Sequence, residues 1–243
     1  LSAGNTGAAV AASTIKLRLL PGVERAGIVS PLPSSRGYVL VSDTGANPDA
    51  KPSHLVGYAV MTALMARYIY NIENPNVGVM SNGTEDCKGS EFSKETYKLL
   101  RRLADEGVLP FNFIGNCEGH DLFETDLDVA VTDGFTGNIV LKYTEGMAST
   151  LMSMLKGELM ADTRSKIGAL LSKPAFKRFK KIMDYTEYGG APLLGIDGGV
   201  VKAHGSSNAK AFAAAVGQAR KFALGGINGS IRDAIGQLPD IQD

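Results

Sequence analysis

A short apolar run, a glycine-rich segment and a helical pattern follow one another in residues 128–142, and this stretch restricts the fold most strongly. Val129–Val131 is interpreted as a buried strand and residues 134–138 as a turn. The apolar residues that follow recur at every fourth position, which predicts a helix: Ile139, Tyr143, Met147 and Leu151. Such a turn is typical of an anion site, because glycine lets the backbone approach a ligand and a helix start directs N–H groups at it.

Predicted strands and helices alternate along most of the chain. The other predicted strands are residues 38–42, 77–80, 111–114 and 200–203, and the other main helices are residues 54–70, 93–106 and 209–224. This order predicts an α/β fold with a mostly parallel sheet and right-handed crossovers. Ligands bind at the carboxyl ends of the strands in such sheets, where this chain has loops rich in Gly, Asn, Asp and Thr.

A second predicted anion site lies near the start of the chain, where Gly4, Asn5, Thr6 and Gly7 open a helix that ends before Pro21. A turn of this kind needs a strand to precede it, and too few residues precede Gly4 to form one in full. We therefore expect leading strands before Leu1 in the complete protein. Residues 1–243 are interpreted as a single α/β catalytic domain.

Composition and charge restrict the range of functions expected for this chain. The chain has 25 basic and 25 acidic residues, so its net charge favours neither nucleic acid nor a membrane. The two cysteines form no C-x-x-C pair, which favours a reduced, cytoplasmic protein. No G-x-G-x-x-G is present, and no His or Cys spacing accompanies Asp43, Asp126, Asp128 and Asp133. We therefore expect no cofactor and no metal.

Residues 164–183 contain seven basic residues and no acidic one, and the basic residues alternate with apolar ones at helical spacing. Pro174 divides this segment into two predicted helices. One interpretation is a helical hairpin that packs on a neighbour and has a solvated basic face. The other is a helix pair that lies reversibly on an anionic membrane surface. Nucleic acid is a weaker alternative, because the aromatic residues fall on the apolar side.

Two single residues have alternative interpretations. Cys87, beside Lys88 in the polar loop 81–90, is either an acylated nucleophile or an ordinary loop thiol. His204 follows a predicted strand, where it is either an acid, base or anion donor, or a residue that braces the loop. The loop 81–90 does not match a phosphate-binding P-loop, because Lys88 precedes the second glycine.

Several sequence runs, in order along essentially the whole chain, resemble the bacterial phosphate acyltransferase family, the acyl-acyl-carrier-protein:phosphate transacylases of phospholipid synthesis. The runs Thr-Asp-Gly-Phe-Thr-Gly-Asn and Tyr-Gly-Gly-Ala-Pro-Leu-Leu-Gly are the most specific. The matching runs are residues 2–8, 43–47, 88–89, 113–119, 128–142, 188–195 and 203–207.

The resemblance implies a three-layer α/β/α fold similar to isopropylmalate dehydrogenase and phosphotransacetylase. A basic amphipathic helical hairpin, about residues 157–184, would protrude from it. The resemblance further implies a homodimer in the cytoplasm, peripherally associated with the inner face of the cell membrane. Its substrates would be acyl-acyl-carrier protein and inorganic phosphate. A membrane-bound glycerol-phosphate acyltransferase would then use the acyl phosphate to make phosphatidic acid.

For this reaction we hypothesise the following residue roles from the chemistry that the residues supply. Lys88 would neutralise the phosphate or the thioester oxyanion, and Asp133 would orient or deprotonate the phosphate. Asn138 and His204 complete the predicted catalytic set. The predicted phosphate- and substrate-binding residues are Gly4, Asn5, Thr6, Gly7, Asn47, Glu85, Asn116, Gly134, Thr136 and Gly137. The predicted membrane-contacting residues are Ile167, Leu170, Leu171, Phe176 and Phe179.

Three alternatives stay open at this point. A short-chain acyl-CoA phosphotransacylase would differ in its acyl donor alone. A nicotinamide dehydrogenase could be built on the same fold. A non-catalytic module could bind acyl-carrier protein or a membrane without turning over a thioester.

Overall fold

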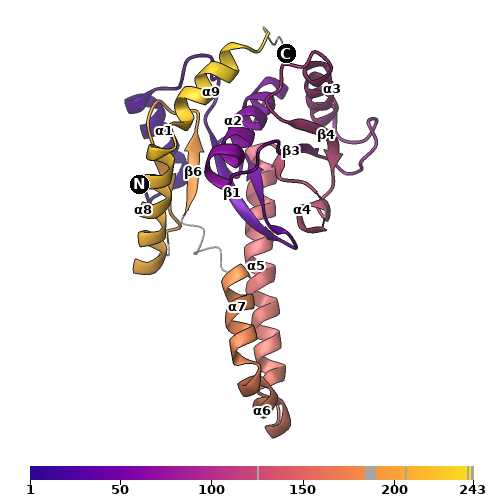
Figure 1. Cartoon of the computed structure of the whole chain (residues 1–243), viewed down its shortest axis with the longest axis vertical. Coiled ribbons are helices and arrows are strands. Elements are labelled where there is room, and N and C mark those ends of the chain that lie inside the picture. The colour runs from indigo at the N-terminus through magenta and orange to yellow at the C-terminus, as the bar shows by residue number, and fades with distance from the viewer. Residues whose placement is uncertain (125, 184–189, 206, 240, 242–243) are drawn as a thin grey trace.

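The computed structural model describes residues 1–124, 126–183, 190–205, 207–239 and 241. The described chain forms a head built on one sheet and a long helical projection (Figure 1). Within these residues the sheet has seven strands in the order β4-β3-β5-β2-β1-β6-β7. Their bounds are β1 Gly27–Ser34, β2 Gly37–Ser42, β3 Asn76–Met80, β4 Asn112–Cys117, β5 Val129–Val131, β6 Ala191–Leu194 and β7 Val200–Lys202.

The sheet is mixed. The half formed by β4, β3, β5 and β2 is parallel, as the alternation predicts. The pairings of β2 with β1, β1 with β6 and β6 with β7 are antiparallel. Strand β1, which contains Pro31 and Pro33, was not predicted from the sequence. Proline is tolerated there because β6 pairs only with Gly27 and Ile28, so both prolines lie where that side of β1 has no partner strand among the described residues.

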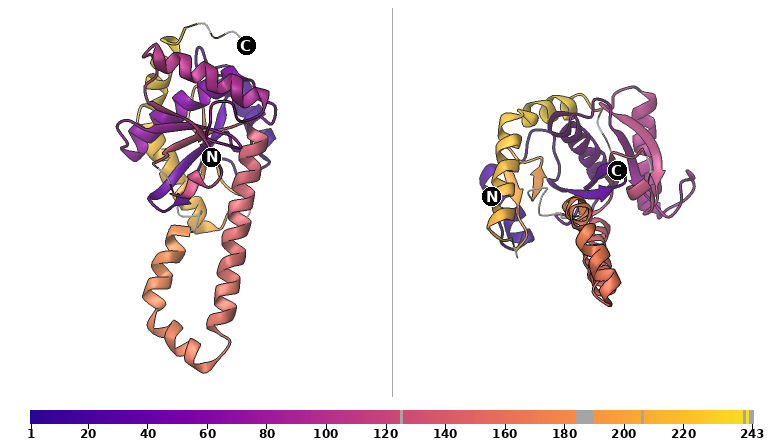
Figure 2. Two further views of the ribbon diagram at one scale, coloured as in Figure 1. Left: turned by 90° about the vertical axis from the view of Figure 1, so that its right-hand side faces the viewer. Right: turned by 60° about the horizontal axis from the view of Figure 1, so that its bottom comes forward.

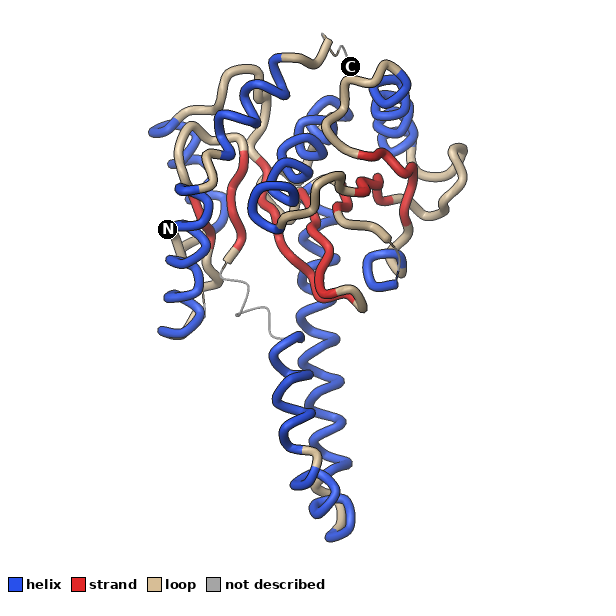
Figure 3. Tube along the Cα trace, in the orientation of Figure 1, coloured by secondary structure: helices blue, strands red, loops and turns tan. Residues whose placement is uncertain are grey.

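Helices cover the sheet and extend beyond it (Figure 3). Their bounds are α1 Thr6–Leu17, α2 Pro52–Tyr70, α3 Glu91–Asp105, α4 Asp121–Glu124, α5 Gly134–Leu159, α6 Thr163–Leu171, α7 Lys173–Met183, α8 Ala209–Leu224 and α9 Ile227–Gly236. The prediction of α8 is confirmed to the residue, whereas α1 ends at Leu17 and not at Leu20. The short α4 and the helix α9 were not predicted.

Alternate residues of β2 point to opposite faces of the sheet, and each face has its own core. Leu40 belongs to the larger cluster, which is built around helix α2, most of whose residues are buried. Val39 and Val41 belong to a second cluster, against which Val140 and Leu141 of α5 pack. Helices thus cover both faces of the parallel half of the sheet, and α5 begins at its carboxyl edge.

Helix α5 continues well past the sheet, α6 lies at the far end of the projection, and α7 runs from there back towards the head (Figure 2). Asp162 caps α6 by accepting a hydrogen bond of 2.9 Å from the Ser165 N–H. The chain divides at Ser172, two residues before Pro174, as predicted. Ile167, Leu170, Leu171 and Phe179 are exposed, Phe176 is half-buried, and predicted tip residue 184 lies outside the described residues. None of the helices in the described ranges combines the length and hydropathy needed to cross a bilayer.

Candidate active site

The prediction of a turn at residues 134–138 is wrong, because these residues form the first turn of α5. Asp133 is the N-cap: its Oδ1 accepts a 2.8 Å hydrogen bond from the Thr136 N–H, and its Oδ2 accepts one from the Thr136 hydroxyl. The glycines are required for close packing. A Cβ on Gly134 would lie 2.6 Å from the Asn47 carbonyl oxygen, and one on Gly137 would overlap the backbone of Asp43.

This cap changes what the start of α5 offers to a ligand. The N–H groups of Thr136 and Gly137 already donate to Asp133, to its side chain and its carbonyl oxygen respectively. The Gly134 N–H donates to the Asn47 carbonyl oxygen at 2.9 Å. The Asp133 carboxylate also adds negative charge at the helix start. The predicted phosphate donors at Gly134, Thr136 and Gly137 are therefore occupied within the protein.

Asp43 is buried and organises the loop that packs against α5. Its carboxylate accepts hydrogen bonds from the backbone N–H groups of Ile28, Ala46 and Asn47 at 2.7–3.0 Å. Burial raises the pKa of Asp43, while these hydrogen bonds oppose the rise. Asn47, a predicted substrate ligand, instead donates its side-chain amide to the Ala26 carbonyl oxygen at 2.6 Å. In this structure Asn47 is a brace between two loops.

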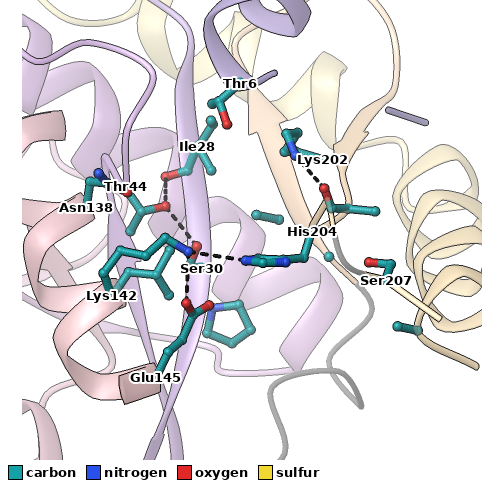
Figure 4. A pocket seen from close by; sticks show the side chains of 16 residues that line it. Thr6, Ile28, Ser30, Thr44, Asn138, Lys142, Glu145, Lys202, His204 and Ser207 are labelled. Carbon is teal, nitrogen blue, oxygen red and sulfur yellow. Dashed lines mark hydrogen bonds and ion pairs between the residues drawn. The ribbon is translucent and has the colours of Figure 1, made fainter. Parts of the chain in front are cut away.

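A cavity of about 150 Å³ lies between α5 on one side and β7 and α8 on the other. It contains Thr6, Asn138 and His204, three of the predicted site residues (Figure 4). Its lining divides by chemistry into a polar part and an apolar part. The polar part is Thr6, Ser30, Thr44, Asn138, Lys142, Glu145, Lys202, His204 and Ser207. The apolar part includes Ile28, Pro31, Leu141, Ala191, Ala203 and Ala211.

Two lysines that the sequence analysis did not select face this cavity. Lys142 Nζ lies 2.8 Å from Glu145 Oε2 and 3.4 Å from His204 Nε2, so it joins α5 to the loop after β7. Lys202 Nζ donates to the Ala203 carbonyl oxygen. Burial, and then the positive charge of Lys142, lower the pKa of Lys202. The spacing could have indicated both: Lys142 is one helical turn after Asn138, and Lys202 is two residues before His204.

The start of α1 opens on the same cavity through Thr6. Asn5 is the N-cap, and its side chain accepts a 3.0 Å hydrogen bond from the Ala8 N–H. The first intrahelical bond runs from the Ala9 N–H to the Asn5 carbonyl oxygen, so the Thr6 and Gly7 N–H groups precede the helical ladder. Gly4, Asn5 and Gly7 are exposed. The predicted anion site at residues 4–7 is thus placed beside Lys202 and His204.

The remaining predicted residues lie elsewhere. Asp133 and Thr136 face a second hollow, of about 240 Å³, together with Ser81, Asn82 and Gly89 of the loop 81–90. Lys88 and Glu85, both of which the structure describes, line neither hollow, and both are exposed.

Asn116 lies in β4 and not in the loop after it, and its side-chain amide donates to the Glu85 carbonyl oxygen at 2.9 Å. The predicted catalytic and binding residues are therefore divided between two hollows, and others, including Lys88 and Asn116, line neither. Tyr188, Gly189 and Ser206 of the matching runs lie outside the described residues. No group of three or more His, Cys, Asp or Glu in the described part of the chain is arranged to hold a metal ion.

The fold defines a mixed α/β protein with a partly parallel central sheet, an architecture shared with a solved phosphotransacetylase. The EutD phosphotransacetylase from Staphylococcus aureus superposes with a TM-score of 0.55 at 17% identity, covering 98% of this chain and 61% of that one. This likeness concerns the fold alone.

Sequence comparison identifies the family. The model of the family described as "Fatty acid synthesis protein" matches residues 1–228. Phosphate acyltransferases from Akkermansia muciniphila and Citrifermentans bemidjiense are 51% and 46% identical over 243 and 237 residues, and the phosphate acyltransferase of Campylobacter jejuni is 43% identical over 237. These matches include 98–100% of this chain. They include 70%, 66% and 70% of the length of the three relatives, in the same order. The chain belongs to the phosphate acyltransferase family, a family of acyltransferase enzymes, and the resemblance stated from sequence is confirmed.

Proposed function

We propose that this protein transfers an acyl group from acyl-acyl-carrier protein to inorganic phosphate. A phosphate oxygen attacks the thioester carbonyl, a C–O bond forms, and the C–S bond breaks, giving acyl phosphate and the carrier thiol. The observation that carries the proposal is that Lys142, Lys202, His204 and the start of α1 converge on one cavity with an apolar wall. Cationic and N–H donors suit the phosphate, and the apolar wall suits the part of the acyl group next to the thioester carbonyl.

In this mechanism the Lys142 and Lys202 ammonium groups and the Thr6 and Gly7 N–H groups hold the phosphate. The Asn138 amide donates to the oxyanion that develops on the thioester carbonyl. His204, whose Nε2 lies 3.4 Å from Lys142 Nζ, delivers a proton to the departing sulfur. Glu145 holds the Lys142 ammonium in place through its 2.8 Å contact.

The two lysines in the cavity thereby take the charge-neutralising role that was predicted for Lys88. Asp133 is left as a helix cap, since both of its carboxylate oxygens accept hydrogen bonds from Thr136. The catalytic roles predicted for Lys88 and Asp133 from the sequence stay predictions. Substitution of Lys142 and of Lys88 by the same residue separates the two assignments.

The test is the loss of thioester from palmitoyl-acyl-carrier protein, with and without phosphate, catalysed by the purified protein. We expect phosphate-dependent release of acyl phosphate. Lys142→Gln should lower kcat/KM at least about 100-fold, the usual loss for one oxyanion or anion donor. Lys98→Gln, which removes an exposed lysine of α3, is the matched control. Wild-type turnover by Lys142→Gln, with a large loss in Lys88→Gln, would return the role to Lys88. Carrier binding without turnover would indicate a binding module.

We further propose that α6 and α7 rest on the inner, anionic face of the cell membrane, near the acyltransferase that consumes the acyl phosphate. The exposed side chains of Ile167, Leu170 and Leu171 are 56–78% accessible, and basic residues flank them: Arg164, Lys166, Lys173, Lys177 and Arg178. Leu170→Glu/Phe179→Glu should abolish sedimentation with anionic vesicles. Leu224→Glu, at an equally exposed leucine of α8, should not. Equal vesicle binding by all three proteins would exclude this role.

We also propose that a second copy of the chain covers α5. Large apolar side chains recur on its solvent side at four-residue spacing and are 40–66% exposed: Phe135, Ile139, Tyr143, Met147 and Leu151. A two-fold pairing would bury the same stripe on both copies. Light scattering should show a dimer for the wild type and a monomer for Met147→Glu/Leu151→Glu. A monomeric wild type would remove the dimer from the proposal.

A further inference from the structure

We propose that the alkyl chain of the acyl substrate binds in an apolar slot beneath α1, between that helix and strands β1, β6 and β7. This inference rests on the proposed function, because it begins from a thioester carbonyl held in the cavity beside Lys142 and His204. It names the part of the molecule that would select for chain length.

The slot lies next to the cavity. Thr6, Ile28 and Lys202 line both spaces, and Figure 4 places these three residues together at the end of the cavity away from Glu145. Beyond them the slot is lined mainly by apolar side chains: Ala9, Val10, Leu193 and Val200. Ser2 is the other polar residue at the slot, and its hydroxyl already accepts a hydrogen bond from the Gly4 N–H at 3.3 Å.

The lining changes from charged at the mouth to apolar at the floor. A fatty acyl thioester has the same order, with a polar reacting end and an apolar chain. Lys202 stands at the mouth, where the charged phosphate and the carbonyl would meet. Ile28, Leu193 and Val200 form the floor and belong to one buried apolar cluster, which Val10 of α1 covers. An alkyl chain that entered past Lys202 would exchange water for apolar walls.

The slot is closed in this structure and must widen to hold a chain. Its volume is about 10 Å³, at the lower limit of the roughly 10–15 Å³ that a cavity needs to hold one water molecule. Helix α1 can provide the movement, because none of its residues is buried.

Backbone hydrogen bonds hold the chain on both sides of α1. Ser2 N donates to the Val201 carbonyl oxygen at 3.0 Å, and Leu20 N donates to the Gly195 carbonyl oxygen at 2.9 Å. The middle of α1, over Ala9 and Val10, is therefore the part expected to shift when a chain enters.

Donors of increasing chain length test this inference. Each buried methylene contributes about fourfold to binding, so wild-type kcat/KM should rise from butanoyl to hexadecanoyl donors. Ala9→Phe puts a ring into the slot and should lower the hexadecanoyl-to-butanoyl ratio at least about tenfold. Ala12→Phe, the same change on the exposed side of α1, should leave that ratio within about twofold of wild type. An unchanged ratio in Ala9→Phe would overturn the inference.

A measurement on the wild type guards against a variant that misfolds. Palmitoyl-acyl-carrier protein should slow amide hydrogen exchange in residues 9–14 of α1 more than butanoyl-acyl-carrier protein does, and it should leave α3 unchanged. Equal exchange with both donors would contradict the slot. If the wild type shows no phosphate-dependent turnover, the proposed function fails. In that case palmitate binding tests the slot. Ala9→Phe should weaken palmitate binding at least about tenfold relative to Ala12→Phe, and equal affinities of the two variants would refute the slot.

Discussion

Gly137, in the first turn of α5, packs so closely against the backbone of Asp43 that a Cβ on Gly137 would overlap the Asp43 carbonyl oxygen. Gly137→Ala should therefore destabilise the protein by about 1–3 kcal/mol, the usual cost of overpacking a well-packed site. Gly146→Ala on the same helix is the control. Its added methyl meets nothing within 4 Å, so it should stabilise by about 0.5–1 kcal/mol through helix propensity. Urea denaturation measures both, and shifts of the same sign would contradict this view of Gly137.

Asp133 should act as a cap whose effect is on stability. Asp133→Ala removes the acceptor for the Thr136 N–H and hydroxyl, and should cost about 1 kcal/mol in thermal unfolding. Asp133→Asn should lose only a few tenths of that, since Asn is a comparable N-cap residue. Because Asp133 does not line the cavity around Lys142, Asp133→Asn should keep most of the acyl transfer. Loss of transfer in a stably folded Asp133→Asn would show that the carboxylate acts in the chemistry.

Lys202 should lose its proton at a lower pH than an ordinary lysine, because burial and the nearby Lys142 charge lower its pKa. Bound phosphate favours the charged form and should raise this pKa, so phosphate affinity should fall as pH rises through the pKa of free Lys202. Titration of ¹³C-methylated lysines by NMR measures the shift. Lys142→Gln should move the Lys202 pKa upward, whereas Lys142→Arg keeps the charge and should not. If neither Lys142 variant changes the pKa of Lys202, the proposed proximity of the two ammonium groups is contradicted.

The two cysteines should differ sharply in reactivity. Burial, with a smaller contribution from Asp121, raises the pKa of Cys117 to about 12, whereas Cys87 is exposed on the loop 81–90. A disulfide reagent at pH 8 should label Cys87 rapidly and Cys117 only after unfolding. Cys87→Ser should abolish rapid labelling of the folded protein. Two equivalents of rapid labelling in the wild type would mean that Cys117 is accessible.

The local sequence pattern correctly predicted those strands and helices whose residues are buried uniformly or at strictly periodic positions. Val129–Val131 is apolar at every position and lies between two parallel neighbours, and α8 is bounded by its Asn208 cap and Gly225. Strand β1 was missed because Pro31 and Pro33 argue against a strand unless one side of it lacks a partner. That condition depends on where β6 pairs, which no local pattern contains.

The site was predicted in part for a similar reason. Thr6, Asn138 and His204 were found because Gly-Asn turns and strand ends mark the carboxyl edge. The glycines of residues 134–138 suggested a flexible turn, although tertiary packing against Asp43 and Asn47 requires them. Lys142 and Lys202 were missed because a lysine on a helix or strand is usually a surface residue. The spacing from Asn138 and from His204 marks each lysine singly, but only the approach of α5 to the end of β7 brings the two lysines to one cavity.

Helix α5 runs uninterrupted from Gly134 to Leu159, so Asn138 and the outer end of this helix keep a fixed rotation relative to each other about one helix axis. Adding a single residue between them would turn everything beyond it by about 100° and advance it by about 1.5 Å. Adding three or four residues would nearly restore the original direction. Related chains can therefore vary the reach of the projection in whole helical turns, but the face that it presents is tied to the orientation of Asn138 in the cavity.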